Sequence, residues 1–329
     1  MITGVSETLQ GFQDKKIAVV GVGGVGGYLA GMLVKAYPHV TLVARGERGE
    51  SIRENGLVLH SDFHGEIVAK PEKTVSCSTE LEPQDYIFIC VKNYSLEEAC
   101  RELKSAVTDN TVIIPVMNGA DPGERTREYL GKGIVIDSLI YIVAFANADY
   151  SVTQQGGFAS LRIGMKCPNE VEQAKLAETS ELLKGANIDH KISADIEREI
   201  WRKYILNCAY NVTTAYYDNT IGELRNDPKK AREYEQLVEE AYEVAVKKGV
   251  HVKPEHKEAI IHRFYHELAD DATSSLQRDV NAGRPTEVET FSGYLVREAK
   301  RLGVEVPVSE RMYEELKNIV SYRGLFFVF

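Results

Sequence analysis

Short apolar runs alternate with helical patterns through the first half of the chain. Between these runs, hydrophobic residues recur about every three to four positions, which is typical of amphipathic helices. The alternation predicts an α/β fold with a Rossmann-type, doubly wound parallel sheet. Residues 151–155 and 158–163, on either side of Gly156 and Gly157, predict a β-hairpin that closes or extends this domain. The predicted strands of the sheet are residues 17–20, 40–44, 85–91, 112–115 and 134–138.

The pattern changes near residue 192. Beyond this point the hydrophobic residues follow a period of about 3.6 with few strand signals, which predicts helices. We therefore expect a Rossmann domain over residues 1–192 and an all-helical domain over residues 193–329. The predicted helices of the second domain are residues 194–217, 229–248, 254–270, 272–280, 286–302 and 309–322.

Composition and charge narrow the class of protein. The 329 residues are 43% hydrophobic, which is enough for each of two domains to bury a core. The net charge of -10 argues against a general nucleic-acid binder, because phosphate contacts require a basic surface. The opening residues lack a secretory signal, and no apolar run reaches the length of a membrane span. We therefore expect a cytoplasmic protein with no nucleic-acid or membrane partner.

The metal-ligating residue types show no spacing typical of a metal site. His262 and His266 are four residues apart, but no third ligand is evident, so we expect them on a surface helix face. The cysteines are odd in number and lack CxxC spacing, which predicts reduced thiols rather than a disulfide framework or a zinc site. They are Cys77, Cys90, Cys100, Cys167 and Cys208.

The segment KIAVVGVGGVG, residues 16–26, runs from an apolar strand into GxGxxG and then into a helical pattern. Gly21 permits a tight turn, Gly23 lets the backbone approach a pyrophosphate, and Gly26 lets helix and strand pack closely. This context predicts a dinucleotide site, with a glycine-rich turn that holds no ligand as the alternative. The expected cofactor-binding residues of the turn are Gly21, Val22, Gly23, Gly24, Val25 and Gly26.

Residues that follow the later strands bear on the choice of cofactor. Rossmann proteins that bind NAD place an acidic residue about 20 positions after the glycines, where its carboxylate accepts a hydrogen bond from the ribose 2′-OH. This chain has Arg45 there and Arg48 nearby, and forked guanidinium donors suit a 2′-phosphate, which predicts NADP(H). Glu47 lies between the two arginines and is able to accept a hydrogen bond from a 2′-OH, which leaves NAD(H) open as the alternative. Lys92 and Asn118 follow core strands and are expected at the ligand-binding edge, although Asn-Gly is also an ordinary turn sequence.

One predicted helix carries Lys203, Asn207 and Asn211 at intervals of four residues. They form a single polar stripe on a largely apolar helix, so we expect the stripe to face a ligand cleft. A polar edge satisfied by neighbouring backbone is the alternative. Further along, Ser275 lies in another predicted helix, and Glu287 falls near a helix start, where the helix dipole favours its negative charge.

Several of these motifs, taken in order, resemble the ketopantoate reductase (2-dehydropantoate 2-reductase) family over nearly the whole chain. In the first half they are GVGGVG, Arg45, the VKN of residues 91–93 and the NG of residues 118–119. In the second half, WRKYILNCAYNVTTA, IGEL and SSLQRDVNAGRPTEVETFSGYLV are similar to the family's lysine helix and its serine, aspartate and Thr-Glu segment. The resemblance implies a Rossmann domain followed by an all-α domain like the C-terminal domain of 6-phosphogluconate dehydrogenase.

The resemblance also implies roles for the candidate residues. Lys203 corresponds to the family's catalytic general acid, and Glu287 to the acidic residue that helps to orient the substrate and the lysine. Arg45 corresponds to a cofactor-binding residue, and Lys92 and Asn118 to residues near both cofactor and substrate. The positions that correspond to substrate-binding residues are Asn207, Asn211, Ser275, Asn118 and Lys92.

The activity implied is NADPH-dependent reduction of 2-dehydropantoate to pantoate in pantothenate and coenzyme A biosynthesis. The partner is then a small-molecule 2-oxo acid, and a homodimer is left open. Two alternatives remain, a reductase of another 2-oxo acid and an NADPH-binding redox sensor without turnover. The residues before Lys15 and the apolar tail over residues 324–329 have no counterpart that we can assign, and we expect the tail to pack on its own chain or on a partner.

Overall fold

The computed structural model describes the fold of residues 11–326 and the side chains as far as residue 319. The chain divides into two compact units between Ile196 and Glu197. Residue 192, the expected boundary, is the end of strand β11 (His190–Ile192), which belongs to the first unit. The first ten residues and the tail beyond residue 326 lie outside the described part. The prediction that the apolar tail packs on its own chain or on a partner therefore stays a prediction.

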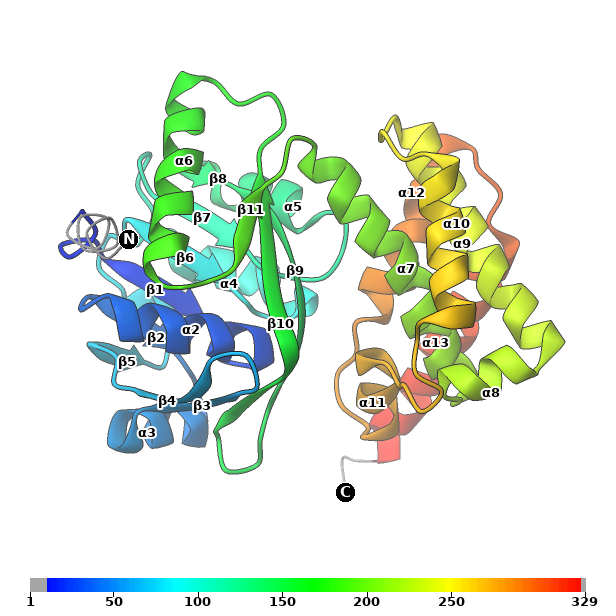
Figure 1. The fold of residues 1–329 in the computed structure, drawn as a ribbon, viewed down its shortest axis with the longest axis horizontal. Coiled ribbons are helices and arrows are strands. Elements are labelled where there is room, and N and C mark those ends of the chain that lie inside the picture. Colours follow the sequence, from blue (N-terminus) through cyan, green and yellow to red (C-terminus); the bar gives the residue numbers. More distant parts are fainter. Residues whose placement is uncertain (1–10, 327–329) are drawn as a thin grey trace. The chain divides into compact units, whose positions relative to one another are not determined.

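A parallel sheet forms the centre of the first unit (Figure 1). Its strands lie in the order β5-β2-β1-β6-β7-β8, and every neighbouring pair is parallel. This is the strand order of a Rossmann fold, and the order reverses between β1 and β6. The prediction of a doubly wound sheet is confirmed. The strands are β1 (Ile17–Val20), β2 (Val40–Val43), β5 (Lys73–Val75), β6 (Tyr86–Ile89), β7 (Val112–Pro115) and β8 (Ile134–Val135).

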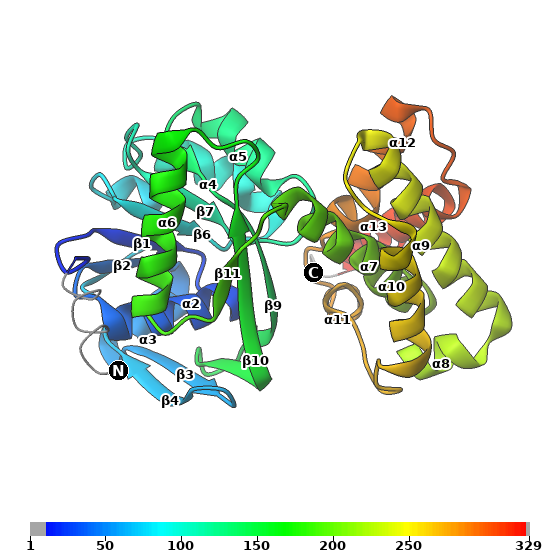
Figure 2. The ribbon, with the colours of Figure 1, turned by 45° about the horizontal axis from the view of Figure 1, so that its top comes forward.

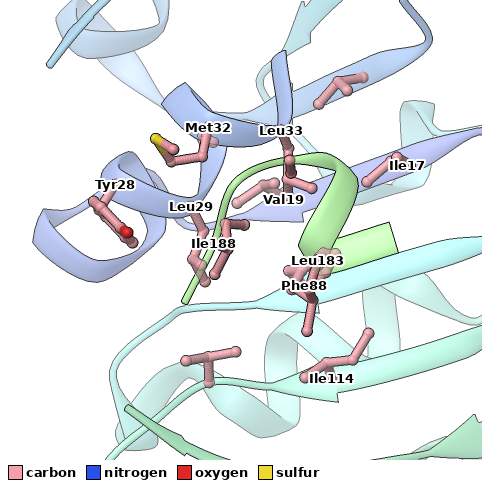
Figure 3. Close-up of a cluster of buried hydrophobic side chains, with 14 of the residues drawn as sticks. Ile17, Val19, Tyr28, Leu29, Met32, Leu33, Phe88, Ile114, Leu183 and Ile188 are labelled. Atoms are coloured by element: carbon pink, nitrogen blue, oxygen red, sulfur yellow. The ribbon is translucent and has the colours of Figure 1, made fainter. Parts of the chain in front are cut away.

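Helices cover both faces of this sheet, and the side chains of each strand point alternately to one face and the other. Ile17 and Val19 join a core with helices α2 (Gly24–Ala36) and α6 (Glu170–Gly185), as the close-up in Figure 3 shows. Ala18 and Val20 join a second core on the opposite face. That core is closed by α4 (Leu96–Leu103) and α5 (Pro122–Leu130), while α3 (Gly46–Asn55) follows β2.

The predicted hairpin over residues 151–163 is wrong, because both segments belong to one strand, β10 (Val152–Gly164). β10 pairs along its length with the antiparallel β9 (Asp137–Ala146), and the register shifts between Gln155 and Ser160. Gly156 has a φ of +83°, so the glycine pair bends the strand in a bulge instead of reversing it. The second sheet has the order β11-β10-β3-β4, and the hairpin of β3 (Leu57–Ser61) and β4 (Gly65–Ala69) was not predicted.

The second sheet packs directly on α2 because that helix carries glycines on the facing side. A Cβ atom on Gly24 would lie 2.3 Å from the carbonyl oxygen of Ala144 in β9. A Cβ on Gly27 would lie 2.4 Å from a methyl carbon of Val152 in β10. The glycine-rich helix start therefore serves the close packing of two layers as well as the turn before it.

The described residues of the second unit form helices joined by loops, with no strands, as predicted (Figure 2). Its long helix α9 shows why the boundaries fall where they do: Asp227 accepts a hydrogen bond from the Lys229 amide at 2.9 Å, and Gly249, with a φ of +87°, ends the helix. The helices are α7 (Ile196–Tyr217), α8 (Ile221–Asn226), α9 (Pro228–Lys248), α10 (Pro254–His266), α11 (Ser275–Asn281), α12 (Tyr294–Leu302) and α13 (Pro307–Phe326).

Several predicted helices of this unit differ in extent from the observed ones. The helix predicted over 254–270 ends at His266, and the one predicted over 272–280 starts only at Ser275, whose preceding residue Ser274 caps it by accepting from the Gln277 amide at 3.1 Å. The segment predicted over 286–302 contains a π-helical turn, η3 (Glu289–Gly293), before α12. π-Helical turns often occur at functional sites.

All five cysteines are unpaired, in agreement with the prediction of free thiols. Among the residues that the structure describes, none of the helices combines the length and the apolar character that a membrane crossing requires.

Candidate functional site

The glycine turn between β1 and α2 has the backbone geometry that the GxGxxG pattern predicts. Gly21 has a φ of +91°, a conformation that L side chains rarely adopt. A Cβ on Gly26 would lie 1.9 Å from the carbonyl oxygen of Gly21 and 2.8 Å from Cβ of Cys90 in the chain after β6. A Cβ on Gly23 would meet no atom within 4 Å, so space remains open in front of the turn.

The N-terminus of α2 fits an anionic group. No side chain caps this helix end, and its first turn contains no acidic residue. The side chain of Val22 is buried, and that of Val25 packs against the same core. These residues therefore offer a ligand only their backbone N–H groups, which is how Rossmann folds bind a pyrophosphate. Packing also requires a glycine at position 24, because a side chain there would clash with the backbone of Ala144.

Lys92 and Asn118 both lie beyond the carboxyl ends of neighbouring strands, β6 and β7. Asn93, which the sequence did not single out as a site residue, connects their two loops: its side-chain amide donates to the carbonyl oxygen of Asn118 at 2.7 Å. Arg125 of α5 donates to the backbone oxygen of Asn93 at 3.3 Å. Asn93 is 4% exposed, so this connection is part of the interior of the unit. The only sequence signal for Asn93 was its place in the VKN motif, because its partners lie 25 and 32 residues away.

The arginines expected near a ribose 2′-phosphate lie at the start of α3, directly after β2. Arg45 is the residue before the helix, and its Nη2 lies 2.9 Å from Oε1 of Glu102. The Arg45 side chain is 61% exposed and therefore accessible to a ligand. Nη1 of Arg48 donates to the carbonyl oxygen of Tyr150 at 3.1 Å, and the Tyr150 hydroxyl donates to Glu47. Neither Glu102 nor Tyr150 was predicted.

The predicted polar stripe is present on α7 in the second unit. The side-chain amide of Asn211 donates to Oδ1 of Asn207 at 3.4 Å. Oγ of Ser275, at the start of α11, donates in turn to Oδ1 of Asn211 at 3.2 Å, and the Leu276 amide approaches the same oxygen at 3.4 Å. Three of the predicted substrate-binding residues are therefore joined in one hydrogen-bonded group.

Lys203 lies one helical turn before Asn207 on the same stripe. Burial lowers the pKa of its ammonium from 10.5 to about 8, and the charge of Glu287 opposes this shift. Glu287 is 4% exposed and stands immediately before the helical residues that lead into η3. The backbone oxygen of Glu287 accepts from the Thr290 and Phe291 amides at 3.0 and 3.1 Å, which fixes the start of that segment.

Aromatic packing holds the two segments that carry Lys203 and Glu287. The Tyr204 hydroxyl on α7 donates to the carbonyl oxygen of Thr290 in the π-helical turn at 2.9 Å. The ring of Tyr204 also contacts those of Trp201 and Tyr294, with centroids 5.3 and 5.7 Å apart. Trp201 and Tyr204, which flank Lys203 on α7, are both buried, so the lysine stands on a rigid helix.

Two other candidates have ordinary structural surroundings. His262 and His266 are exposed on α10 with ring centroids 4.5 Å apart, as expected for a surface helix face. Asp279, one turn after Ser275 on α11, forms an ion pair of 2.8 Å with Arg284. Neither position is needed to account for the stripe on α7.

Comparison with known proteins identifies the family. The family model described as ketopantoate reductase PanE/ApbA matches residues 17–166, and the model of the C-terminal part of the same family matches residues 195–320. The chain is 29% identical over 302 residues to an uncharacterized oxidoreductase of Bacillus subtilis, covering 92% of this chain and 98% of that protein.

Solved structures agree with this assignment. A 2-dehydropantoate 2-reductase from Porphyromonas gingivalis is 30% identical, with a TM-score of 0.78 over 93% of this chain and 100% of that chain. A D-mandelate dehydrogenase solved with NADH and anilino(oxo)acetate shares the fold, with a TM-score of 0.82 and 22% identity over 94% of this chain and 99% of that chain. This chain therefore belongs to the ketopantoate reductase family and is an oxidoreductase.

Proposed function

We propose that the protein catalyses the NADPH-dependent reduction of 2-dehydropantoate to pantoate in the cytoplasm. The observation that carries the proposal is Lys203, whose burial lowers its pKa to about 8 on a helix that also presents Asn207 and Asn211. An ammonium with a pKa near the working pH is a much better proton donor than an ordinary surface lysine. The Porphyromonas gingivalis relative is named for this reaction, and family membership supports it.

The turn after β1 supports a dinucleotide, and the arginines after β2 support NADP(H) over NAD(H). Backbone N–H groups at the uncapped start of α2 would hold the pyrophosphate. The guanidinium groups of Arg45 and Arg48 would hold the 2′-phosphate by bidentate hydrogen bonds. The family uses a nicotinamide dinucleotide, and the reduced nicotinamide supplies the hydride when bound.

The residues of the second unit would handle the substrate. As negative charge develops on the keto oxygen, Nζ of Lys203 stabilises it and delivers the proton that completes the alcohol. Ser275 would hold the substrate carboxylate, while Asn207 and Asn211 would hold a hydroxyl group. Glu287 opposes the loss of the lysine proton, and so helps to keep the donor charged until it is needed.

One alternative is a reductase of another 2-oxo acid. The D-mandelate dehydrogenase structure supports this alternative, because a protein of the same fold is named for a different 2-hydroxy acid and was solved with NADH. A redox sensor without turnover is disfavoured by the group of Lys203, Asn207, Asn211 and Ser275, since a sensor has no need for a proton donor beside polar side chains that can hold a substrate.

The test is the oxidation of NADPH and of NADH, followed with the purified protein and a panel of 2-oxo acids: 2-dehydropantoate, pyruvate, 2-oxoisovalerate and oxaloacetate. The proposal predicts the highest kcat/KM for NADPH with 2-dehydropantoate. A higher kcat/KM for another acid would favour the alternative reductase. Stoichiometric NADPH binding without oxidation in the presence of any acid would favour the sensor.

A further inference from the structure

Tyr150 joins the turn between β9 and β10 to the start of α3. Its carbonyl oxygen accepts from Nη1 of Arg48 at 3.1 Å, and its ring lies under the same guanidinium at 5.7 Å from the centroid. Its hydroxyl donates to Oε2 of Glu47. One side chain therefore contacts two consecutive charged residues of α3, more than 100 positions away in sequence.

The backbone at Tyr150 supports a specific role for these contacts. Its φ is +70°, in the left-handed region that bulky side chains rarely adopt. The turn holds this conformation with a hydrogen bond from the Tyr150 amide to Asn147, and the Ser151 amide donates to Asp149 at 3.0 Å. The turn thus directs the Tyr150 side chain to α3 at the cost of local strain.

The two residues that Tyr150 contacts have opposite effects on a ribose 2′ substituent. A guanidinium attracts a 2′-phosphate, whereas a carboxylate repels it and would accept a hydrogen bond from a 2′-OH. Glu47, two positions after Arg45, is the only acidic residue between positions 42 and 49 of the sequence. An unrestrained Glu47 carboxylate would therefore favour NAD(H) over NADP(H).

We propose that Tyr150 is a positioning residue that selects the 2′-phosphorylated cofactor, by holding the Glu47 carboxylate and orienting the Arg48 guanidinium. This inference rests on the proposed function, because it concerns the same dinucleotide site. The hydrogen bond to Glu47 raises the pKa of the Tyr150 phenol, so the phenol stays protonated as a donor at neutral pH. Arg45, two positions before Glu47 in the sequence, completes the site and is held by Glu102.

The experiment measures binding of two fragments, 2′,5′-ADP and 5′-AMP, to the full-length protein by isothermal titration calorimetry. Their affinity ratio reports the 2′-phosphate contribution alone. Tyr150→Phe removes only the hydroxyl, and we expect the ratio to fall about tenfold, the effect of losing one charge-assisted hydrogen bond.

A double-mutant cycle separates this role from a general structural one. In a Glu47→Gln background, Tyr150→Phe should leave the ratio unchanged, because the carboxylate that Tyr150 restrains is gone. The matched control is Tyr265→Phe, which removes a Tyr–Glu hydrogen bond of 2.7 Å to Glu235 in the second unit and should not alter the ratio.

The outcomes are distinguishable. A protein that binds neither fragment would show that the proposed dinucleotide site is wrong, and the role of Tyr150 with it. A wild-type protein that prefers 2′,5′-ADP, together with a Tyr150→Phe variant of equal preference, would overturn the role of Tyr150 alone. A tenfold loss that persists in the Glu47→Gln background would also overturn it, since the effect would not pass through Glu47.

Discussion

At the scale of single residues, the proposed proton transfer depends on two opposing effects on the pKa of Lys203. Burial disfavours its ammonium form and lowers the pKa from 10.5 to about 8, while the charge of Glu287 favours the ammonium. The donor form is the protonated one, so activity should be complete below about pH 8 and should fall as the pH rises through that value. In the proposed mechanism, the balance between burial and the carboxylate therefore sets the alkaline limit of activity.

Glu287→Gln tests this balance. The substitution removes the charge that raises the pKa of Lys203, so that pKa falls and the alkaline limb of the kcat profile should move to lower pH. The control is Glu289→Gln, which removes an exposed carboxylate paired with Arg297 and should leave the limb in place. An unchanged or upward-shifted limb in Glu287→Gln would contradict the assigned role.

Candidate site residues on one helix face could be predicted from the sequence. Residues whose contacts lie far away in the sequence could not. Lys203, Asn207 and Asn211 share a helix face, and helical periodicity is enough to place them together. Asn93 and Tyr150 are different, because each makes its contacts with residues that are remote in sequence. No periodic pattern encodes such a contact, and only the folded chain reveals it.

At the scale of elements, the turn between β1 and α2 combines two kinds of glycine. Gly26 has no room for a side chain, since a Cβ would lie 1.9 Å from a backbone oxygen. Gly23 has room, since a Cβ there would meet no protein atom within 4 Å. Packing explains the first glycine, and the proposed dinucleotide would explain the second.

Substitution of the two glycines by alanine separates these reasons. Gly26→Ala should destabilise the protein by about 1–3 kcal/mol or more, because the methyl group clashes with backbone. Gly23→Ala should leave the thermal midpoint nearly unchanged and should weaken NADPH binding at least about tenfold, because its methyl group occupies the space expected for the pyrophosphate. Thermal unfolding and titration calorimetry measure both. Normal NADPH affinity in Gly23→Ala would argue against a dinucleotide at this turn.

The same scale shows where patterns of hydrophobic residues fail. Central strands such as β1 and β7 are buried along their whole length and were predicted with correct bounds. β10 was predicted as a hairpin because Gly156 and Gly157 are typical turn residues. The pairing of β10 with β9 on both sides of the bulge keeps it as one strand, and such pairing is a tertiary property. The π-helical turn over Glu289–Gly293 was not predicted either, because the hydrophobic pattern there is that of an ordinary helix.

For the whole molecule, the proposal assigns different tasks to the two compact units. The first unit carries the glycine turn and the arginines that would bind the cofactor, and the second carries Lys203. A protein with a net charge of -10 must concentrate positive charge locally to bind an anionic dinucleotide, and in the proposal Arg45 and Arg48 would provide that charge. Cofactor binding and proton transfer should therefore respond separately to mutation.

The most direct test of the central claim compares kcat and NADPH affinity in Lys203→Ala. If Lys203 is the proton donor, kcat falls at least about 100-fold, the lower range for loss of a general acid, and the alkaline limb near pH 8 disappears. The dissociation constant for NADPH, measured by titration, should change little, because the lysine belongs to the other unit. A variant that keeps near-normal kcat, or that loses activity only through weaker NADPH binding, would contradict the account.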